Sequence, residues 1–351
     1  MAGGRSSLLS PLCRKNPKCW GMIKNLYYCG PVSDHFDGTR FFIRGGAADK
    51  SKADLWRLIR TKREAWPAEV KNPPAARPPS RVEGPALKVT MIGHASLLIQ
   101  TRGLNLLVDP VWSKRASPFS FAGPRRVTPP GIGLSDLPRL DAILITHNHY
   151  DHLDLATLRA LSKIRPCRII APLGNDAIIN RRGLASEAYD WGDSVALSSE
   201  VRAILVPTYH WSARGPGDQR MALWAGFVLE TPDGPLYLIG DTAYRDGRLF
   251  REIPECFGRP RFAAIPIGAY EPRWFMRDNH ANPAESVQIF RDCQAHHALA
   301  CHWGTFQLTA EAREDPPRRL AAALEAQGIG QDRFQVRLPG EAFDVPMIPR
   351  D

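Results

Sequence analysis

The 351-residue sequence lacks any run of about 18 consecutive apolar residues, which is the length that a membrane-spanning helix needs. Its first residues also lack the apolar core of a signal peptide, because Ser10 and Pro11 interrupt the run that begins at Leu8. The seven cysteines are odd in number and form no CxxC pair, which argues against a disulfide framework. We therefore expect reduced thiols and a cytoplasmic protein.

Positive charge is concentrated in the first quarter of the chain. Residues 1–82 carry 16 Lys and Arg against 6 Asp and Glu, which gives +10 and accounts for the whole formal net charge. This segment ends in the Pro-rich run KNPPAARPPSRV, so we expect residues 1–82 to be a basic extension with a linker and residues 83–351 to be the main domain. Such a segment suits an anionic membrane surface, and a solvated arm is the alternative. It lacks the interleaved aromatic residues of single-strand nucleic-acid binders, so we expect no nucleic-acid partner.

The stretch most informative about chemistry is THNHYDHLD. The apolar, β-branched run 142–145 before it predicts a buried strand. After this strand, His147, His149 and Asp151 alternate by two and can point the same way, whereas His152 points elsewhere. One segment can therefore serve two adjacent metal ions. Nitrogen and oxygen ligands suit Zn²⁺, Mn²⁺ or iron better than Ca²⁺, and the alternative is a polar surface loop.

Four further predicted strands also end in a carboxylate or a histidine. These residues are Asp109, His210, Asp241 and His302. Because residues at successive strand ends converge on one edge of a sheet, we expect them to meet the THNHYDHLD segment in one pocket. For Asp109 alone, a role as a strand-end turn residue is the alternative.

The motif HxHxDH followed by a later His, Asp and His resembles the metallo-β-lactamase superfamily. That resemblance implies an α/β fold, the four-layer αββα sandwich, with the metals at one rim. It also implies the ligands: His147, His149 and His210 for the first metal, Asp151, His152 and His302 for the second, and Asp241 bridging both. Asp109 would not touch a metal but would orient a ligand histidine through that histidine's free ring N–H.

Residues 89–340 resemble one family within this superfamily more closely, the N-acyl-phosphatidylethanolamine-hydrolysing phospholipases D. The stretches that carry the resemblance are GHAS, VDPVWSKRASPFSFAGPRR, THNHYDHLD, PTYHW, GDTAY, IPIGAYEPRWFM and HWGTF. The resemblance implies two zinc ions, a metal-bridging hydroxide that cleaves the phospholipid to phosphatidic acid and N-acylethanolamine, and a homodimer. Catalytic roles fall to Asp151 and Asp241 at the metals and to His280, which would stabilise or protonate the leaving alkoxide. A capping or surface histidine is the alternative for His280.

A lipid substrate also needs an apolar groove. Arg273 followed by Trp274, Phe275 and Met276 suits an acyl chain beside a phosphate, and ordinary core packing is the alternative for each apolar residue. The direction of His94, in a Gly-flanked turn after a strand, is left open.

Three other functions compete with the phospholipase hypothesis. A soluble phosphodiesterase or a lactonase would keep the site and change the substrate. A nuclease fits the basic composition, but the basic excess lies outside the motif. A membrane-surface binding protein with structural metals is disfavoured, because structural sites are closed and need only four donors per metal. We expect the hydrolase to associate peripherally with anionic membrane.

Overall fold

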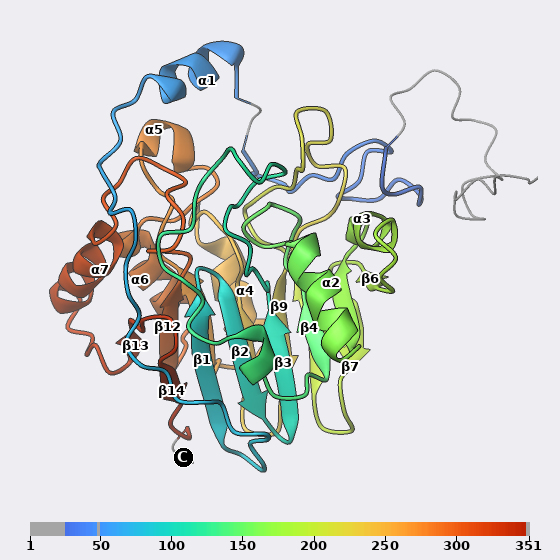
Figure 1. Cartoon of the computed structure of the whole chain (residues 1–351), viewed down its shortest axis with the longest axis vertical. Helices are drawn as coiled ribbons and strands as arrows, with labels where there is room; N and C mark the ends of the chain where they lie inside the picture. Colours follow the sequence, from blue (N-terminus) through green and yellow to red (C-terminus); the bar gives the residue numbers. More distant parts are fainter. Residues whose placement is uncertain (1–24, 48–49, 349–351) are drawn as a thin grey trace, which may run out of the picture.

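Two seven-stranded mixed β-sheets form the centre of the molecule (Figure 1). This computed structural model describes residues 25–47 and 50–348. The first sheet has the order β14-β1-β2-β3-β4-β5-β6, and its strands 3 to 6 are parallel. Its strands are β1 (Leu87–Gly93), β2 (Ser96–Thr101), β3 (Leu104–Val108), β4 (Ala142–Leu144), β5 (Arg168–Pro172), β6 (Glu187–Tyr189) and β14 (Ala342–Asp344).

The second sheet repeats this plan with the order β13-β12-β11-β10-β9-β8-β7. An antiparallel meander from β7 to β10 is followed by parallel strands to β13. Its strands are β7 (Ser194–Ala196), β8 (Arg202–Val206), β9 (Gly226–Glu230), β10 (Leu236–Leu238), β11 (Phe262–Pro266), β12 (His297–Cys301) and β13 (Phe334–Gln335). The turn residues TPDGP at 231–235 predict a hairpin, and β9 and β10 on either side of them pair antiparallel as expected.

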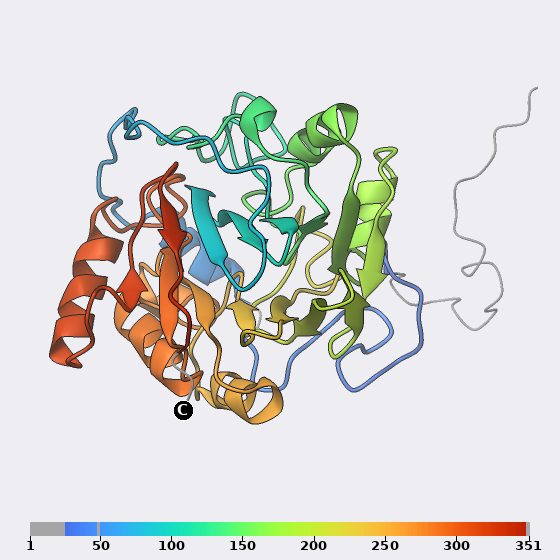
Figure 2. The same ribbon diagram turned by 90° about the horizontal axis from the view of Figure 1, so that it is seen from below.

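Helices cover the outer face of each sheet, and apolar residues fill the three interfaces between the layers. Between the sheets, residues such as Leu106 and Leu144 meet Leu205 and Phe227. The helices α2 (Leu155–Ile164) and α3 (Asn175–Asn180) cover the first sheet, and α4 (Arg248–Phe257), α6 (Pro283–Asp292) and α7 (Asp315–Ala326) cover the second. Figure 2 shows α2 and the helices α4, α6 and α7 on opposite sides of the paired sheets. The predicted αββα sandwich is confirmed.

Two of these helices begin at Asp154 and Asn282, residue types whose place before an apolar helical pattern predicts an N-cap. The Asp154 carboxylate accepts hydrogen bonds from the backbone N–H groups of Ala156 and Thr157 at the start of α2. Asn282 and Glu285 form a reciprocal capping box at the start of α6. Because each cap follows directly on a candidate site segment, the caps fix where those segments leave the sheet.

The spacing of Leu55, Leu58 and Ile59 predicts a helix over residues 52–65, and the helix in the structure is shorter. α1 spans Lys52–Ile59 and has no buried residue. Beyond it the backbone turns toward the body, where Glu64 N–H donates to the Ala310 carbonyl. None of the described helices combines the length and the apolar character needed to cross a bilayer.

Part of the basic segment belongs to the packed structure. Phe36 and Phe41 are 1% and 0% exposed and form one cluster with Leu223 and Trp224. The boundary at residue 82 stays a prediction, but a deletion that removes these two phenylalanines would uncover Trp224.

Replacing Phe41 by alanine is expected to lower the free energy of unfolding by about 3 to 5 kcal/mol, because it leaves a cavity in this cluster. Chemical denaturation measures the change. Val32, which is 69% exposed, provides the control, and Val32→Ala should change stability by less than about 0.5 kcal/mol. Equal stability of both variants would contradict the packing role of this segment.

Candidate metal centre

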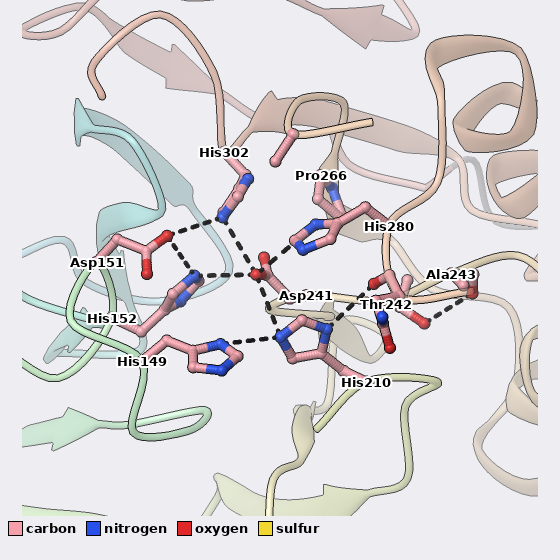
Figure 3. A network of polar contacts seen from close by, with 12 residues as sticks. His149, Asp151, His152, His210, Asp241, Thr242, Ala243, Pro266, His280 and His302 are labelled. Carbon is pink, nitrogen blue, oxygen red and sulfur yellow. Dashed lines mark hydrogen bonds and ion pairs between the residues drawn. The ribbon is translucent and has the colours of Figure 1, made fainter. Parts of the chain in front are cut away.

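Strands from both sheets deliver the candidate ligands to one rim of the sandwich. β4 leads to the His147–His152 segment, β8 to His210, β10 to Asp241 and β12 to His302. The seven predicted ligands fall into three groups, and within each group the donor atoms lie within 4.8 Å of one another. The third group shares Asp241 with the first group and His302 with the second. The convergence expected of the strand ends is therefore present (Figure 3).

The first group contains the three histidines expected for the first metal. The Nδ1 atom of His149 lies 2.8 Å from His147 Nε2 and 3.1 Å from His210 Nε2. His210 Nδ1 is 3.1 Å from the Asn279 carbonyl, which favours a proton on Nδ1 and turns Nε2 toward the group. Asp241 completes the group.

The second group gathers around Asp151. Its Oδ2 atom lies 3.2 Å from His302 Nε2 and 3.6 Å from His152 Nε2. His94, whose direction the sequence left open, also belongs to this group, with its Nε2 atom 2.9 Å from Asp151 Oδ2. His94 is 2% exposed, so it lies inside the site.

The Asp241 carboxylate lies between the two groups. Its Oδ2 atom is 3.6 Å from His210 Nε2 on one side, and 3.3 Å and 3.1 Å from the Nε2 atoms of His152 and His302 on the other. From this position the carboxylate is within reach of ions in both groups, as the bridging role expected of Asp241 requires.

Asp109 makes the contact expected of a residue that orients a ligand. Its Oδ2 atom lies 2.7 Å from His152 Nδ1 and accepts a hydrogen bond from the Thr146 hydroxyl. Its Oδ1 atom accepts from the Thr146 backbone N–H. Fully buried and bonded in this way, Asp109 fixes the ring of His152 with Nε2 facing the group.

The backbone adopts left-handed conformations where strands deliver these residues. His94, Asp109 and His302 have φ values of 57°, 40° and 61°. Non-glycine residues adopt such angles at an energetic cost, and they persist where the surroundings hold them. Here His302 N–H donates to the His94 carbonyl, and His94 N–H donates to the Thr305 hydroxyl. Gly240, beside Asp241, has φ of 70°, and a Cβ there would lie 2.8 Å from the Thr146 side chain.

Charge in the centre is divided between the groups. Burial and the neighbouring His210 lower the pKa of His149 to about 3, so this ring is neutral at pH 7. Burial also lowers the pKa of His302, but Asp241 and Asp151 outweigh it and raise the pKa to about 9. Burial would raise the pKa of the Asp241 carboxyl, yet His302 and His152 hold it well below its usual range.

The donor set fits divalent metal ions. His152 Nε2 and Asp241 Oδ1 are buried and have no hydrogen-bond partner among the described residues. Buried polar atoms are normally satisfied, and a metal ion would satisfy these two. Imidazole and carboxylate donors suit Zn²⁺, Mn²⁺ or iron. The described residues thus include His/Asp clusters able to bind metal.

One further residue of the centre, Arg214, was not found from the sequence. Its Nη1 atom donates to the carbonyls of Asn148 and Leu153, and its guanidinium lies 3.7 Å from the Tyr150 ring centroid. Arg214 therefore stabilises the backbone of residues 148–153, the segment that carries three of the candidate ligands. A single arginine more than 60 residues downstream carries no motif that would reveal this contact.

The residues expected to bind substrate lie beside the centre, on and after α5 (Arg273–Met276). The N–H groups of Asn279 and His280 donate to the Met276 carbonyl, so this short helix positions His280. Trp274, Phe275 and Met276 are partly exposed.

The contacts of Arg273 differ from those expected of a phosphate ligand. Its guanidinium donates to both carboxylate oxygens of Glu285 at 3.0 and 2.9 Å and to the His280 carbonyl at 2.9 Å. Both Glu285 oxygens accept from the same nitrogen, Nη2, and Nη1 serves the His280 carbonyl, so both terminal nitrogens of the guanidinium are engaged within the protein and phosphate binding by Arg273 stays a prediction. Arg273 therefore supports the His280 loop.

Comparison with known proteins agrees with this geometry. A family model described as a beta-lactamase superfamily domain matches residues 104–303. The chain is 36% identical over 252 residues to N-acyl-phosphatidylethanolamine-hydrolyzing phospholipase D 1 of Caenorhabditis elegans, which covers 69% of this chain and 70% of that protein. It is 33% identical to the mitochondrial N-acyl-phosphatidylethanolamine-hydrolyzing phospholipase D of Saccharomyces cerevisiae, over 68% of this chain and 52% of that protein.

A solved structure shows the same fold at lower sequence identity. The isothiocyanate hydrolase from Delia radicum gut bacteria superposes with a TM-score of 0.60 at 21% identity, over 73% of this chain and 98% of that chain. The paired sheets and the His/Asp clusters thus define a metal-dependent hydrolase of the beta-lactamase superfamily. Within this superfamily, the chain belongs to the family of N-acyl-phosphatidylethanolamine-hydrolysing phospholipases D.

Metal binding to the second group is expected to release protons at pH 7. The raised pKa values of His152 and His302 mean that both rings are protonated in the metal-free protein, and an ion must displace those protons. Affinity should therefore rise by about tenfold per pH unit for each displaced proton, up to the pKa of about 9 of His302. The neutral rings of the first group release none.

Calorimetric metal titration in two buffers of different ionisation enthalpy counts these protons. A metal affinity that stays constant between pH 6 and pH 8, with no proton release, would contradict the assignment of charge.

Proposed function

We propose that the protein is a dinuclear-zinc phosphodiesterase of the phospholipase D type. Its substrate would be N-acyl-phosphatidylethanolamine or a related phospholipid, which it would cleave to phosphatidic acid and N-acylethanolamine. The observation that carries the proposal is the position of Asp241 Oδ2 between two clusters of metal-binding side chains. Two-metal sites are suited to phosphodiester hydrolysis, and the relatives named above support the lipid substrate.

Two divalent ions would supply water activation at neutral pH and would neutralise charge on a phosphate oxygen. His147, His149 and His210 would hold the first ion, and Asp151, His152 and His302 the second, with Asp241 shared. The protein's own contribution is to fix this donor set before substrate arrives. Asp109 orients His152, and the Asn279 carbonyl orients His210.

We assign His280 a direct contact with the substrate. Its Nδ1 atom lies 3.9 Å from Asp241 Oδ2 and has no hydrogen-bond partner among the described residues. Burial lowers its pKa well below the usual value, so the ring is neutral at pH 7. We assign His280 to donating an N–H hydrogen bond to the phosphate or to the leaving oxygen. In this role it does not need to carry a positive charge.

The acyl chains would lie along the partly exposed side chains of Trp274, Phe275 and Met276. These residues stand at the start of the loop that carries His280, so an apolar chain on α5 would leave the phosphodiester near the clusters. Peripheral binding to anionic membrane by the basic segment, and assembly as a homodimer, are further parts of the proposal.

The central test measures metal content and N-acylethanolamine release from vesicles that contain N-acyl-phosphatidylethanolamine, with and without a chelator. Two zinc ions per chain with chelator-sensitive release are expected. Asp241→Asn should lower the metal content and abolish release, and His302→Ala should do the same, because each removes a shared or second-group donor. Metal without release would move the search to soluble phosphodiesters and lactones, and full activity of either variant would refute the dinuclear site.

His280→Phe is expected to lower kcat by about 100-fold while the zinc content stays unchanged, because the ring volume is kept and the N–H donor is lost. Partial rescue by His280→Gln, which restores an N–H donor, would separate hydrogen bonding from packing. A fall in zinc content in His280→Phe would instead identify His280 as a metal ligand in the third group, with Asp241 and His302.

A further inference from the structure

The outward face of α1 carries large apolar side chains in contact with solvent. Leu55, Trp56 and Ile59 are 47%, 66% and 75% exposed. Their spacing of one to four residues places Trp56 and Ile59 one turn apart on the same side of the helix. In most soluble proteins such contiguous apolar residues mark an interaction site.

The opposite face of α1 is less exposed. Asp54, Leu58 and Thr61 are partly buried, and their spacing of four and three residues aligns them along one side. Trp56 and Ile59 therefore lie on the more exposed side of the helix. The Asp54 carboxylate accepts hydrogen bonds from Ser51 and is committed to capping the helix.

Positive charge surrounds the exposed apolar residues. Residues 51–65 contain five Lys and Arg against two Asp and Glu. Lys52 and Arg60 flank Trp56 on the helix surface, and Lys62 and Arg63 follow directly; all four are exposed. A helix with an apolar centre and a cationic border complements an anionic phospholipid surface, where apolar side chains enter the interface and cations meet phosphates.

α1 is also tied to the elements beside the metal centre. The Arg57 guanidinium lies 4.1 Å from the Trp274 ring centroid on α5. Lys50 Nζ lies 3.0 Å from Asp278 Oδ2, two residues before His280. In Figure 1, α1 and α5 lie together at one end of the molecule, and the C-terminus lies at the other. A surface that binds α1 would therefore face the substrate-binding residues.

We propose that the outward face of α1 docks on an anionic phospholipid surface, with Trp56 and Ile59 in the interface and Lys52 and Arg60 at the phosphates. Docking in this orientation would present membrane-held lipid to the α5 side of the centre. That second step rests on the proposed function, whereas the docking itself does not.

Docking is tested by sedimentation of the full chain with two kinds of vesicle, phosphatidylcholine alone and phosphatidylcholine mixed with phosphatidylglycerol. The double variant Trp56→Ser, Ile59→Ser should bind the anionic vesicles at least about tenfold more weakly than the parent. Ile164, which is 51% exposed on α2, supplies the matched control, and Ile164→Ser should bind like the parent. Arg60→Glu should weaken binding to anionic vesicles and reduce its dependence on salt.

The circular-dichroism spectrum and the thermal unfolding temperature show whether the variants remain folded, and neither should change. If the double variant is unfolded, Arg60→Glu provides the test, and parent-like vesicle binding of Arg60→Glu would then overturn the docking. Parent-like vesicle binding by the double variant overturns it directly. A change in self-association, without a change in vesicle binding, would overturn it by identifying a second copy as the occupant.

The vesicles contain no substrate, so the two proposals fail in different experiments. Binding that depends on α1, together with an absence of N-acyl-phosphatidylethanolamine hydrolysis, supports the docking and refutes the proposed function. Hydrolysis together with α1-independent binding refutes only the docking.

Discussion

The buried carboxylate of Asp241 is the interaction on which the centre depends. Its Oδ2 atom lies within 3.1 to 3.9 Å of ring nitrogens from five histidines, His147, His152, His210, His280 and His302. A buried charge is costly unless partners compensate it, and here the compensation comes from imidazoles delivered by different strands. The histidines depend on Asp241 in turn. Its carboxylate helps to raise the pKa of His302 to about 9, so this ring is positively charged at pH 7 in the metal-free protein. The dinuclear site that we propose would need such a shared anion, since positive ions placed a few ångströms apart repel each other.

The fold supplies this arrangement through its two matched sheets. Each sheet joins an antiparallel meander to parallel strands, and the ligands follow strands from both, so closing the sandwich brings the two halves of the centre together. The tight fit appears in the backbone as well as in the side chains. A Cβ on Gly268 would lie 2.1 Å from the His302 carbonyl oxygen, and His302 itself has a left-handed conformation. The sheets fix the ends of these loops, and the loops pack closely against each other. This close packing holds the candidate ligands in position.

Regular, motif-rich parts of the chain could be predicted from sequence, because their signals are local. The HxHxDH spacing, the strand-end carboxylates and the caps Asp154 and Asn282 each lie within a few residues of the feature they specify. Other features depend on contacts that only the fold creates. His94 contacts Asp151, which lies 57 residues further along the chain. Glu285 caps α6, as its position in the sequence suggests, but it also accepts a hydrogen bond from the Arg273 guanidinium. The helix α4 was missed because Pro254 lies inside it, yet burial of Leu249, Phe250 and Ile253 outweighs that low propensity. The short strands β6 and β14 at the sheet edge carry too few residues for a periodic signal.

The central claim is that Asp241 joins two metal sites into one hydrolytic centre. X-ray crystallography of the zinc-loaded protein, with anomalous scattering measured on both sides of the zinc edge, tests it most directly. The account predicts two anomalous peaks, one among His147, His149 and His210 and the other among Asp151, His152 and His302, with the Asp241 carboxylate in contact with both. A single peak, or two peaks with Asp241 bound to only one of them, would contradict it.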